Sequence, residues 1–412
     1  MHARMSHKYL LYIAIVLLLP LQFGLHMSVL NAPMEYMGCK GVEGPREDCI
    51  EGWNPALPSS MYAIGGLCGS AITTLVTRFV GLDGALCTAS LFFQVGTIVF
   101  WCAGFQGTVL VSRMITGIGA GIAIVCAPIA INQLSPPHLA AFFGAQTQIS
   151  TNLGIIFAQV WGVLWAENHW RRIVAASVFV ALVCLGGTVY LRARGVIAAP
   201  AALHQEGQSN APSITLVELA KNARYRFVLV VSVALFVVQQ LTGINAIILY
   251  GVRILSVVFP DYAKAVNLLI SMTNLVLTLV GAYFINRYGR KRLLVISLSS
   301  MGFFTSMLAF ALVRGLQGLT AAAAILTVAA FAIGIGPIPF LYISEISPPE
   351  AVNAAQSMGT VSSWLATFAV VALFPSLQGS LGSSSFYLFG VSTLASAALG
   401  AYFLQPDSSQ TA

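Results

Sequence analysis

Residues 133–141 read QLSPPHLAA, and residues 345–353 read EISPPEAVN. In each stretch an apolar residue stands directly before Ser-Pro-Pro, and a long apolar run precedes it. A second pair of stretches corresponds in the same way, with RFVG at residues 78–81 and RYGR at residues 287–290. Two such repeats in corresponding positions indicate that the chain contains two copies of one structural unit.

The composition of the chain excludes a water-soluble fold. Of its 412 residues, 58% are hydrophobic and only 8% are charged, whereas a soluble globular chain is about 25% charged. Apolar runs of about 20 residues, enough to span a bilayer as a helix, recur along the chain. These runs are continuous and do not alternate with polar residues, which favours helices over the strands of a membrane barrel. We therefore predict an all-α membrane protein.

Twelve apolar runs are predicted to be transmembrane helices. The two Ser-Pro-Pro stretches then follow the fourth and tenth helices, and RFVG and RYGR follow the second and eighth. This placement is expected for two pseudo-symmetric six-helix bundles. The bundles would comprise residues 1–193 and 226–412, joined by a cytoplasmic loop at residues 194–225. The first run lacks the small-residue cleavage site of a signal peptide, so we expect it to be retained. The spans lie near residues 9–30, 59–79, 84–104, 108–132, 142–165, 173–193, 226–252, 264–285, 294–313, 320–343, 354–376 and 384–404.

The loop charges predict the orientation of the chain. With both termini in the cytoplasm, twelve of the 20 Lys and Arg residues fall on the cytoplasmic side and seven on the outer side. Cytoplasmic loops of membrane proteins carry such an excess. The net charge of +7 therefore needs no nucleic-acid partner, and no base-reading motif is present. We expect a multi-pass protein of the plasma membrane.

Two cysteines, Cys39 and Cys49, share the first outer loop. An oxidising exterior favours a disulfide between them. Sequence spacing does not fix the geometry that a disulfide needs, so the pairing stays open here.

Residues 237–251, VVQQLTGINAIILYG, carry side-chain amides inside an apolar run. This stretch is similar to QQxSGINxxxYY, the seventh-helix signature of the facilitative glucose transporters. LQFGLHMSVLNAP at residues 21–33 resembles their first-helix motif LQFGYxTGVxNAP. GIGPIPFLYISEISP at residues 334–348 resembles GxGPIPWxxxxExFP, and RYGRKR at residues 287–292 resembles RxGRR. The resemblance covers nearly the whole chain. It implies a sugar porter of the major facilitator superfamily, closest to the hexose transporters, in which two bundles rock about a central site.

The amides suit recognition of a neutral sugar, because a carboxamide both donates and accepts hydrogen bonds without bringing a charge into the membrane. Asn245 lies off the helix face of Gln239 and Gln240, and an unwound segment at Gly243 would bring it back. The alternative is that these amides hold helices together. The resemblance implies that sugar hydroxyls contact Gln148, Gln239, Gln240, Asn245 and Asn274, while the sugar ring packs against Phe23, Ile155, Ile244, Phe340 and Trp364.

Several positions depart from the pattern of the family. Phe236 stands in place of a Gln, Phe340 in place of a Trp, and Ser363 and Thr367 in place of two Asn. These changes are expected to remove polar contacts and to shift substrate choice away from glucose. The charged clamp that closes the inner side in the family is also thinned. Its retained members are Arg287, Arg290 and Glu345.

None of the acidic residues falls in the middle of a span. Intramembrane carboxylates are the usual proton relays of coupled transporters. Similar proton-coupled porters carry an Asp in the first helix where this chain has His26, which could titrate or could be a polar helix contact. We therefore expect passive uniport of a small neutral sugar by a monomer in the lipid bilayer. No cofactor or metal is expected.

An enzyme is not expected, because no acid–base pair, metal cluster or nucleophile constellation is evident in the sequence. The alternatives that remain open are a transporter of a polyol or another small neutral metabolite, a proton-coupled sugar symporter, and a non-transporting sugar sensor.

Overall fold

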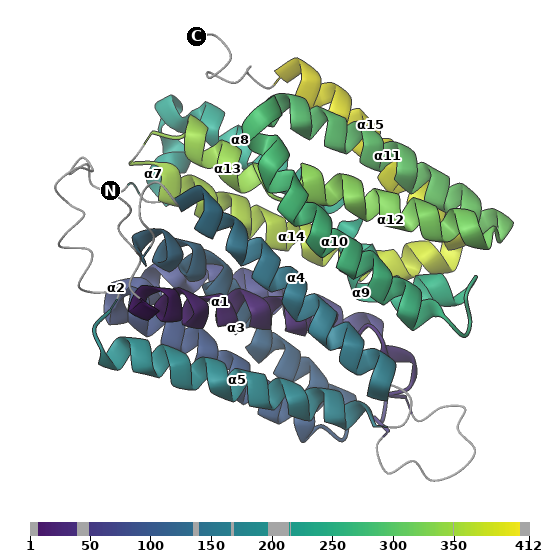
Figure 1. The fold of residues 1–412 in the computed structure, drawn as a ribbon, viewed down its shortest axis with the longest axis horizontal. Helices are drawn as coiled ribbons and strands as arrows, with labels where there is room; N and C mark the ends of the chain where they lie inside the picture. The colour runs from purple at the N-terminus through teal and green to yellow at the C-terminus, as the bar shows by residue number, and fades with distance from the viewer. Residues whose placement is uncertain are drawn as a thin grey trace. The chain divides into compact units, whose positions relative to one another are not determined.

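The computed structural model describes residues 7–38, 49–134, 140–165, 169–196, 214, 216–348 and 350–403. Within these ranges the regular elements are helices (Figure 1), and two isolated β-bridges join Gly38 to Ile50 and Glu51 to Phe105. The predicted all-α membrane fold is confirmed.

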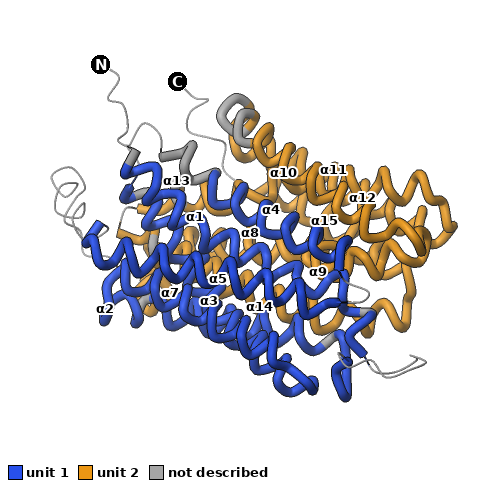
Figure 2. Tube along the Cα trace, turned by 60° about the horizontal axis from the view of Figure 1, so that its bottom comes forward, with its two compact units in different colours: residues 1–210 blue, residues 211–412 orange. Residues whose placement is uncertain are grey.

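The chain divides into two compact units, residues 1–210 and residues 211–412 (Figure 2). The division falls inside the stretch 194–225 that was predicted to join the bundles. Unit 1 contains α1 (His7–Ser28), η1 (Pro33–Glu35), α2 (Ala56–Trp101), α3 (Gln106–Leu134), α4 (Ala140–Trp165) and α5 (Trp170–Ala193).

The helix α2 is 46 residues long and contains two of the predicted spans. Gly81 interrupts it with φ 78° and ψ 173°, a conformation outside the helical region that glycine adopts readily because it lacks a Cβ. The second and third spans are therefore joined through a kink and not through an extended loop.

A close approach of α1 to α4 in unit 1 depends on two glycines. A Cβ at Gly24 would lie 1.9 Å from the backbone oxygen of Thr151, and a Cβ at Gly154 would lie 2.0 Å from the backbone oxygen of Leu21. Small residues at helix crossings let backbones approach in membranes, where apolar burial offers little drive for association.

Unit 2 contains the remaining spans, and two of these are broken into helix pairs. The seventh span consists of α8 and α9, and the tenth of α12 and α13. The elements are α7 (Leu216–Lys221), η3 (Ala223–Tyr225), α8 (Arg226–Leu241), α9 (Ile244–Ser256), α10 (Ala263–Tyr288), α11 (Arg290–Arg314), α12 (Gln317–Ile333), α13 (Ile338–Ile346), α14 (Val352–Leu381), η4 (Gly382–Ser384) and α15 (Ser385–Phe403).

In the part of the chain that the structure describes, nine helical segments are long and apolar enough to cross a membrane. One of them, Ala354–Phe403, includes both α14 and α15. The predicted spans 59–79 and 142–165 lie in α2 and α4. The helices thus account for twelve spans in two six-helix bundles.

Candidate substrate site

The break in the seventh span positions three amide side chains. The helix α8 ends at Leu241, and Gly243 adopts a left-handed conformation with φ 78° and ψ 10° before α9 begins at Ile244. A Cβ at Gly243 would also lie 2.7 Å from Cγ of Phe389. A larger residue would therefore be strained both by the left-handed backbone conformation and by this contact. The turn brings Asn245 back towards Gln240, and Asn245 Nδ2 donates a hydrogen bond to Gln240 Oε1.

The break in the tenth span supplies two backbone acceptors to the same region of unit 2. Ile338 N donates to Gly334 O at 3.0 Å, but the next donor in that register would be residue 339, a proline, which has no N–H. Ile335 O therefore lacks its usual intrahelical partner. Gln239 Nε2 donates to Ile335 O and to Gly336 O, each at 2.9 Å.

The break itself is held by Ser297 of α11. Its hydroxyl donates to Ala330 O at 2.6 Å, and its oxygen accepts from Ile335 N at 3.0 Å. The segment that carries the carbonyl groups of Ile335 and Gly336, which accept from Gln239, is thus held in place by a side chain of α11.

Two hydroxyl groups of α14 complete the polar contacts. Gln240 Nε2 donates to Gln239 Oε1 at 3.2 Å and to Ser363 Oγ at 2.8 Å. Asn245 Nδ2 donates to Thr367 Oγ1 at 3.2 Å. We call Gln239, Gln240 and Asn245 the amide chain; all three are buried. Each hydroxyl accepts an amide N–H, so both positions keep a polar contact inside the protein. The expected loss of polar contacts to the substrate remains a prediction.

The other predicted contact residues of unit 2 lie on four helices. Phe340 is half-buried in α13 and meets the ring of Phe236 edge to face, with ring centroids 4.7 Å apart. Phe236 thus fills with an aromatic ring the position where the family pattern has an amide. The buried side chains Ile244, Asn274 and Trp364 come from α9, α10 and α14.

In unit 1 the predicted contact residues come from α1 and α4, the pair of helices with the close glycine crossing. Phe23 lies on α1, and its backbone oxygen accepts a hydrogen bond from the Tyr62 hydroxyl at 3.3 Å. Gln148 and Ile155 lie on α4, where Gln148 Nε2 donates to Asn152 Oδ1 at 3.4 Å. Gln148 is thus hydrogen-bonded to the residue one helical turn after it.

His26 lies buried in unit 1 among polar and aromatic groups. The hydroxyl of Thr97 donates to Phe93 O at 2.5 Å, so its oxygen can only accept from His26 Nε2, which lies 3.3 Å away. The imidazole stacks on the Phe93 ring with centroids 5.3 Å apart. Arg113 Nη1 donates to the backbone oxygen of His26 at 2.8 Å. Among the residues described, His26 Nδ1 has no hydrogen-bond partner.

Of the three predicted gating residues, Arg290 is half-buried at the first position of α11. The side chains of Arg287 and Glu345 lie outside the described part of the structure. The gating role of all three residues remains a prediction.

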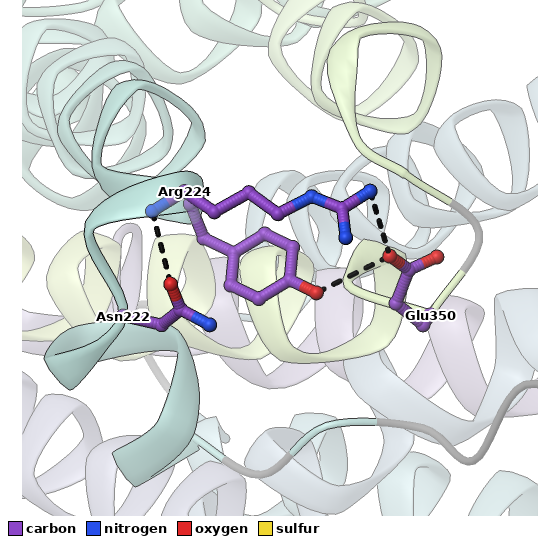
Figure 3. Close-up of polar contacts among 4 residues, drawn as sticks. Asn222, Arg224 and Glu350 are labelled. Atoms are coloured by element: carbon purple, nitrogen blue, oxygen red, sulfur yellow. Dashed lines mark hydrogen bonds and ion pairs between the residues drawn. The ribbon is translucent and has the colours of Figure 1, made fainter.

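A polar cluster that the sequence did not suggest lies where α8 begins and α14 begins (Figure 3). Arg224 Nη2 lies 3.8 Å from Glu350 Oε1, and the Tyr225 hydroxyl donates to the same oxygen at 3.2 Å. The backbone oxygen of Glu350 accepts from Ile214 N at 3.0 Å, and Asn222 Oδ1 accepts from Arg224 N at 3.0 Å. The end of the inter-bundle segment is thus attached to the loop after the tenth span.

Cys49 is disulfide-bonded. Its predicted partner Cys39 lies outside the described residues, so the pairing of these two cysteines remains a prediction. Five other cysteines are free thiols. Within the described ranges, no group of three or more His, Cys, Asp or Glu residues could hold a metal ion.

The sequence profile of the family described as "Sugar (and other) transporter" matches residues 12–193 and 194–409. The chain belongs to this family of sugar porters in the major facilitator superfamily. This sugar porter is 30% identical over 427 residues to a probable metabolite transport protein of Saccharomyces cerevisiae, covering 90% of this chain and 86% of the relative. It is 26% identical over 418 residues to human solute carrier family 2, facilitated glucose transporter member 3, covering 89% of this chain and 83% of the relative.

Among solved structures, the sugar porter is similar to a partially occluded inward-open conformation of the xylose transporter XylE from E. coli. The TM-score is 0.78 at 21% identity, over 98% of this chain and 99% of the other. At this identity the likeness shows the fold alone, which is the twelve-helix fold with two bundles. As a member of the sugar porter family, the protein is a multi-pass integral membrane transporter and not an enzyme.

Proposed function

We propose that this sugar porter carries a hexose-like sugar by facilitative uniport, through alternating access of its two bundles. The observation that carries the proposal is the amide chain of unit 2. Three buried neutral amides are joined to two backbone carbonyls and two hydroxyls. Such a set of neutral donors and acceptors suits a ligand made of hydroxyl groups.

The proposed substrate contacts extend beyond the amide chain. We assign the polar contacts to Gln148 and Asn274 as well, and the contacts with the face of the sugar ring to apolar side chains of both units. The half-buried Phe340 lies in the first turn of α13, directly after the break that anchors Gln239. The apolar set is Phe23, Ile155, Ile244, Phe340 and Trp364.

Passive transport is supported by the sequence of the spans and by the setting of His26. No acidic residue lies in the middle of a span, and coupled transporters usually relay protons through such residues. His26 makes a contact with Thr97 and a ring stack with Phe93, which favours its role as a helix contact.

A second candidate is a transporter of another small neutral solute, with or without proton coupling. Two observations favour it. The relative at 30% identity is named a probable metabolite transport protein, and a solved structure of similar fold is titled a D-xylose-proton symporter. Phe236, where the family pattern has an amide, points in the same direction because an aromatic ring offers neither the two N–H donors nor the oxygen acceptor of an amide.

We place the transporter in the plasma membrane, and the loop charges support an orientation with both termini in the cytoplasm. A relative at 26% identity is named vacuolar protein sorting-associated protein 73, so an internal membrane is the competing location. A fluorescent fusion imaged in cells beside a plasma-membrane marker and a vacuolar marker separates the two.

Counterflow in proteoliposomes tests the proposed function. Purified protein should exchange labelled glucose against internal unlabelled glucose, with xylose, inositol and sorbitol as competitors. The label should equilibrate, and a protonophore should leave the initial rate unchanged. Accumulation of glucose above its outside concentration, abolished by the protonophore, would contradict uniport. Exchange of a polyol in the absence of glucose exchange would replace the proposed substrate.

A further inference from the structure

Every N–H of the amide chain already donates a hydrogen bond inside the protein. The three amide groups carry two N–H bonds each. Gln239 donates to two backbone carbonyls, Gln240 donates to Gln239 and Ser363, and Asn245 donates to Gln240 and Thr367. A ligand that reaches this chain therefore meets amide oxygens and no amide N–H.

The direction of the chain is fixed at one end. A backbone carbonyl can only accept, so the group of Gln239 that faces Ile335 O and Gly336 O must be its NH₂ group. The oxygen of Gln239 must then face Gln240, so Gln240 has to donate to it from its own NH₂ group. The oxygen of Gln240 in turn faces Asn245 and accepts from the NH₂ group of Asn245. The two carbonyls at the break of the tenth span thus set the orientation of every amide that follows.

The groups left over lie at the other end of the chain. In the described part of unit 2, Asn245 Oδ1 receives no hydrogen bond. The hydroxyls of Ser363 and Thr367 accept an N–H each and keep their own hydrogen atoms. Ser363 is half-buried, whereas Thr367 and Asn245 are buried.

We propose that Ser363 and Thr367 are the hydrogen-bond donors of this site, and that the amide chain meets the substrate only through its oxygens. The proposal rests on the proposed function, since it assigns roles within the sugar site. One substrate hydroxyl would accept from Thr367 and donate to Asn245 Oδ1, closing a ring with the Asn245–Thr367 hydrogen bond. Only a group that both donates and accepts fits this place, so the site requires a hydroxyl there and excludes a ketone, an ether and an ammonium group.

Three substitutions test the assignment. Thr367→Val replaces the hydroxyl with a methyl group of similar shape, Thr367→Ser keeps the hydroxyl, and Ser363→Ala removes the second donor. The matched control is Thr360→Val on the same helix. Thr360 is also buried, and its hydroxyl donates at 2.9 Å to Gln356 O of its own helix.

The measurement is the affinity of purified protein for glucose and for its monodeoxy analogues, by calorimetric titration. Thr367→Val and Ser363→Ala should each weaken glucose binding roughly 3- to 10-fold, the range for loss of one neutral hydrogen bond. Thr367→Ser and Thr360→Val should bind like the wild type. For one deoxy position, the loss caused by the analogue and the loss caused by Thr367→Val should not add, because both remove the same hydrogen bond.

Two results would overturn the proposal while leaving the proposed function intact. One is wild-type glucose affinity in both Thr367→Val and Ser363→Ala. The other is additive losses at every deoxy position, which would show that Thr367 only supports the fold. A wild-type protein that binds neither glucose nor its analogues would overturn the proposed function and this assignment together.

Discussion

Gln239 holds the polar groups of two broken spans together at the scale of a single residue. Its NH₂ group satisfies Ile335 O and Gly336 O, and its oxygen accepts from Gln240. Each of these groups would be buried without a partner if the amide were lost, which costs about 1–3 kcal/mol for a neutral group. The residue is therefore required both for the local structure and for the orientation of the amide chain.

Gln239→Leu should weaken substrate affinity roughly 3- to 100-fold, because the chain loses its fixed end. The measurement is the half-saturation concentration for glucose counterflow in proteoliposomes that contain equal amounts of protein. Gln317→Leu is the matched control, since Gln317 also donates to a backbone carbonyl, Val258 O at 3.0 Å, in another part of unit 2. Equal kinetics for the two variants would exclude Gln239 from the site.

At the scale of elements, the crossing of α1 and α4 tolerates no side chain at its closest point. A Cβ at Gly154 would lie 2.0 Å from a backbone oxygen of α1, whereas a Cβ at Gly186 of α5 would meet nothing within 4 Å. Gly154→Ala should destabilise the protein by about 1–3 kcal/mol, the usual cost of overpacking. Gly186→Ala should leave stability unchanged or raise it by up to about 1 kcal/mol, since alanine is the better helix former.

Thermal unfolding of both glycine variants in the same detergent measures this difference. A melting temperature for Gly154→Ala equal to that of Gly186→Ala would mean that the two helices separate easily at their crossing.

The cluster at Glu350 makes a second prediction about an element, the inter-bundle segment. The Arg224 side chain is 70% exposed and that of Glu350 is 19% exposed, so the ion pair is worth less than about 1 kcal/mol. The hydrogen bond from the less exposed Tyr225 should contribute more. Glu350→Gln keeps an acceptor oxygen for Tyr225 and removes the charge, whereas Glu350→Ala removes both.

Limited trypsin digestion, followed by mass spectrometry of the cut at Lys221, compares the two variants. Cleavage should be faster in Glu350→Ala and close to wild type in Glu350→Gln. Equal acceleration in both would show that the charge, and not the hydrogen bond, attaches the segment.

At the scale of the whole molecule, the question is whether transport is coupled to protons. His26 donates to Thr97 and stacks on Phe93, contacts that suit a structural residue. His26→Asn should therefore keep most of the glucose exchange activity between about pH 5.5 and 8, the range in which an ordinary histidine titrates. Loss of pH dependence in this variant, together with loss of sugar accumulation, would instead identify His26 as the coupling group.

Much of the fold could be predicted from sequence, because membrane insertion depends on run length and hydrophobicity, which are local properties. The break at Gly243 could also be expected, because a glycine inside an apolar run can adopt a non-helical backbone conformation. The missing N–H of Pro339 was also visible, but the helix that would use the freed carbonyl was not. The hydrogen bonds of Ser363 and Thr367 could not be foreseen by comparing residues one at a time, since they depend on the packing of α8 and α9 against α14. Tyr225 and Glu350 are 125 positions apart, and no local pattern links them.

The amide chain depends on the missing N–H of Pro339, because its absence leaves Ile335 O available to accept from Gln239. An alanine at this position could donate its N–H to Ile335 O, in register with the Ile338–Gly334 hydrogen bond, and would compete with Gln239 for that acceptor. Gly336 O would still accept from Gln239 and would keep the NH₂ group of Gln239 on that side, so the order of the chain would not reverse. The chain would instead be held less firmly at its fixed end. A substitution that touches no ligand would thus loosen the amide chain, and a weaker glucose affinity in Pro339→Ala, with the wild-type order of affinities among deoxy sugars, would reveal it.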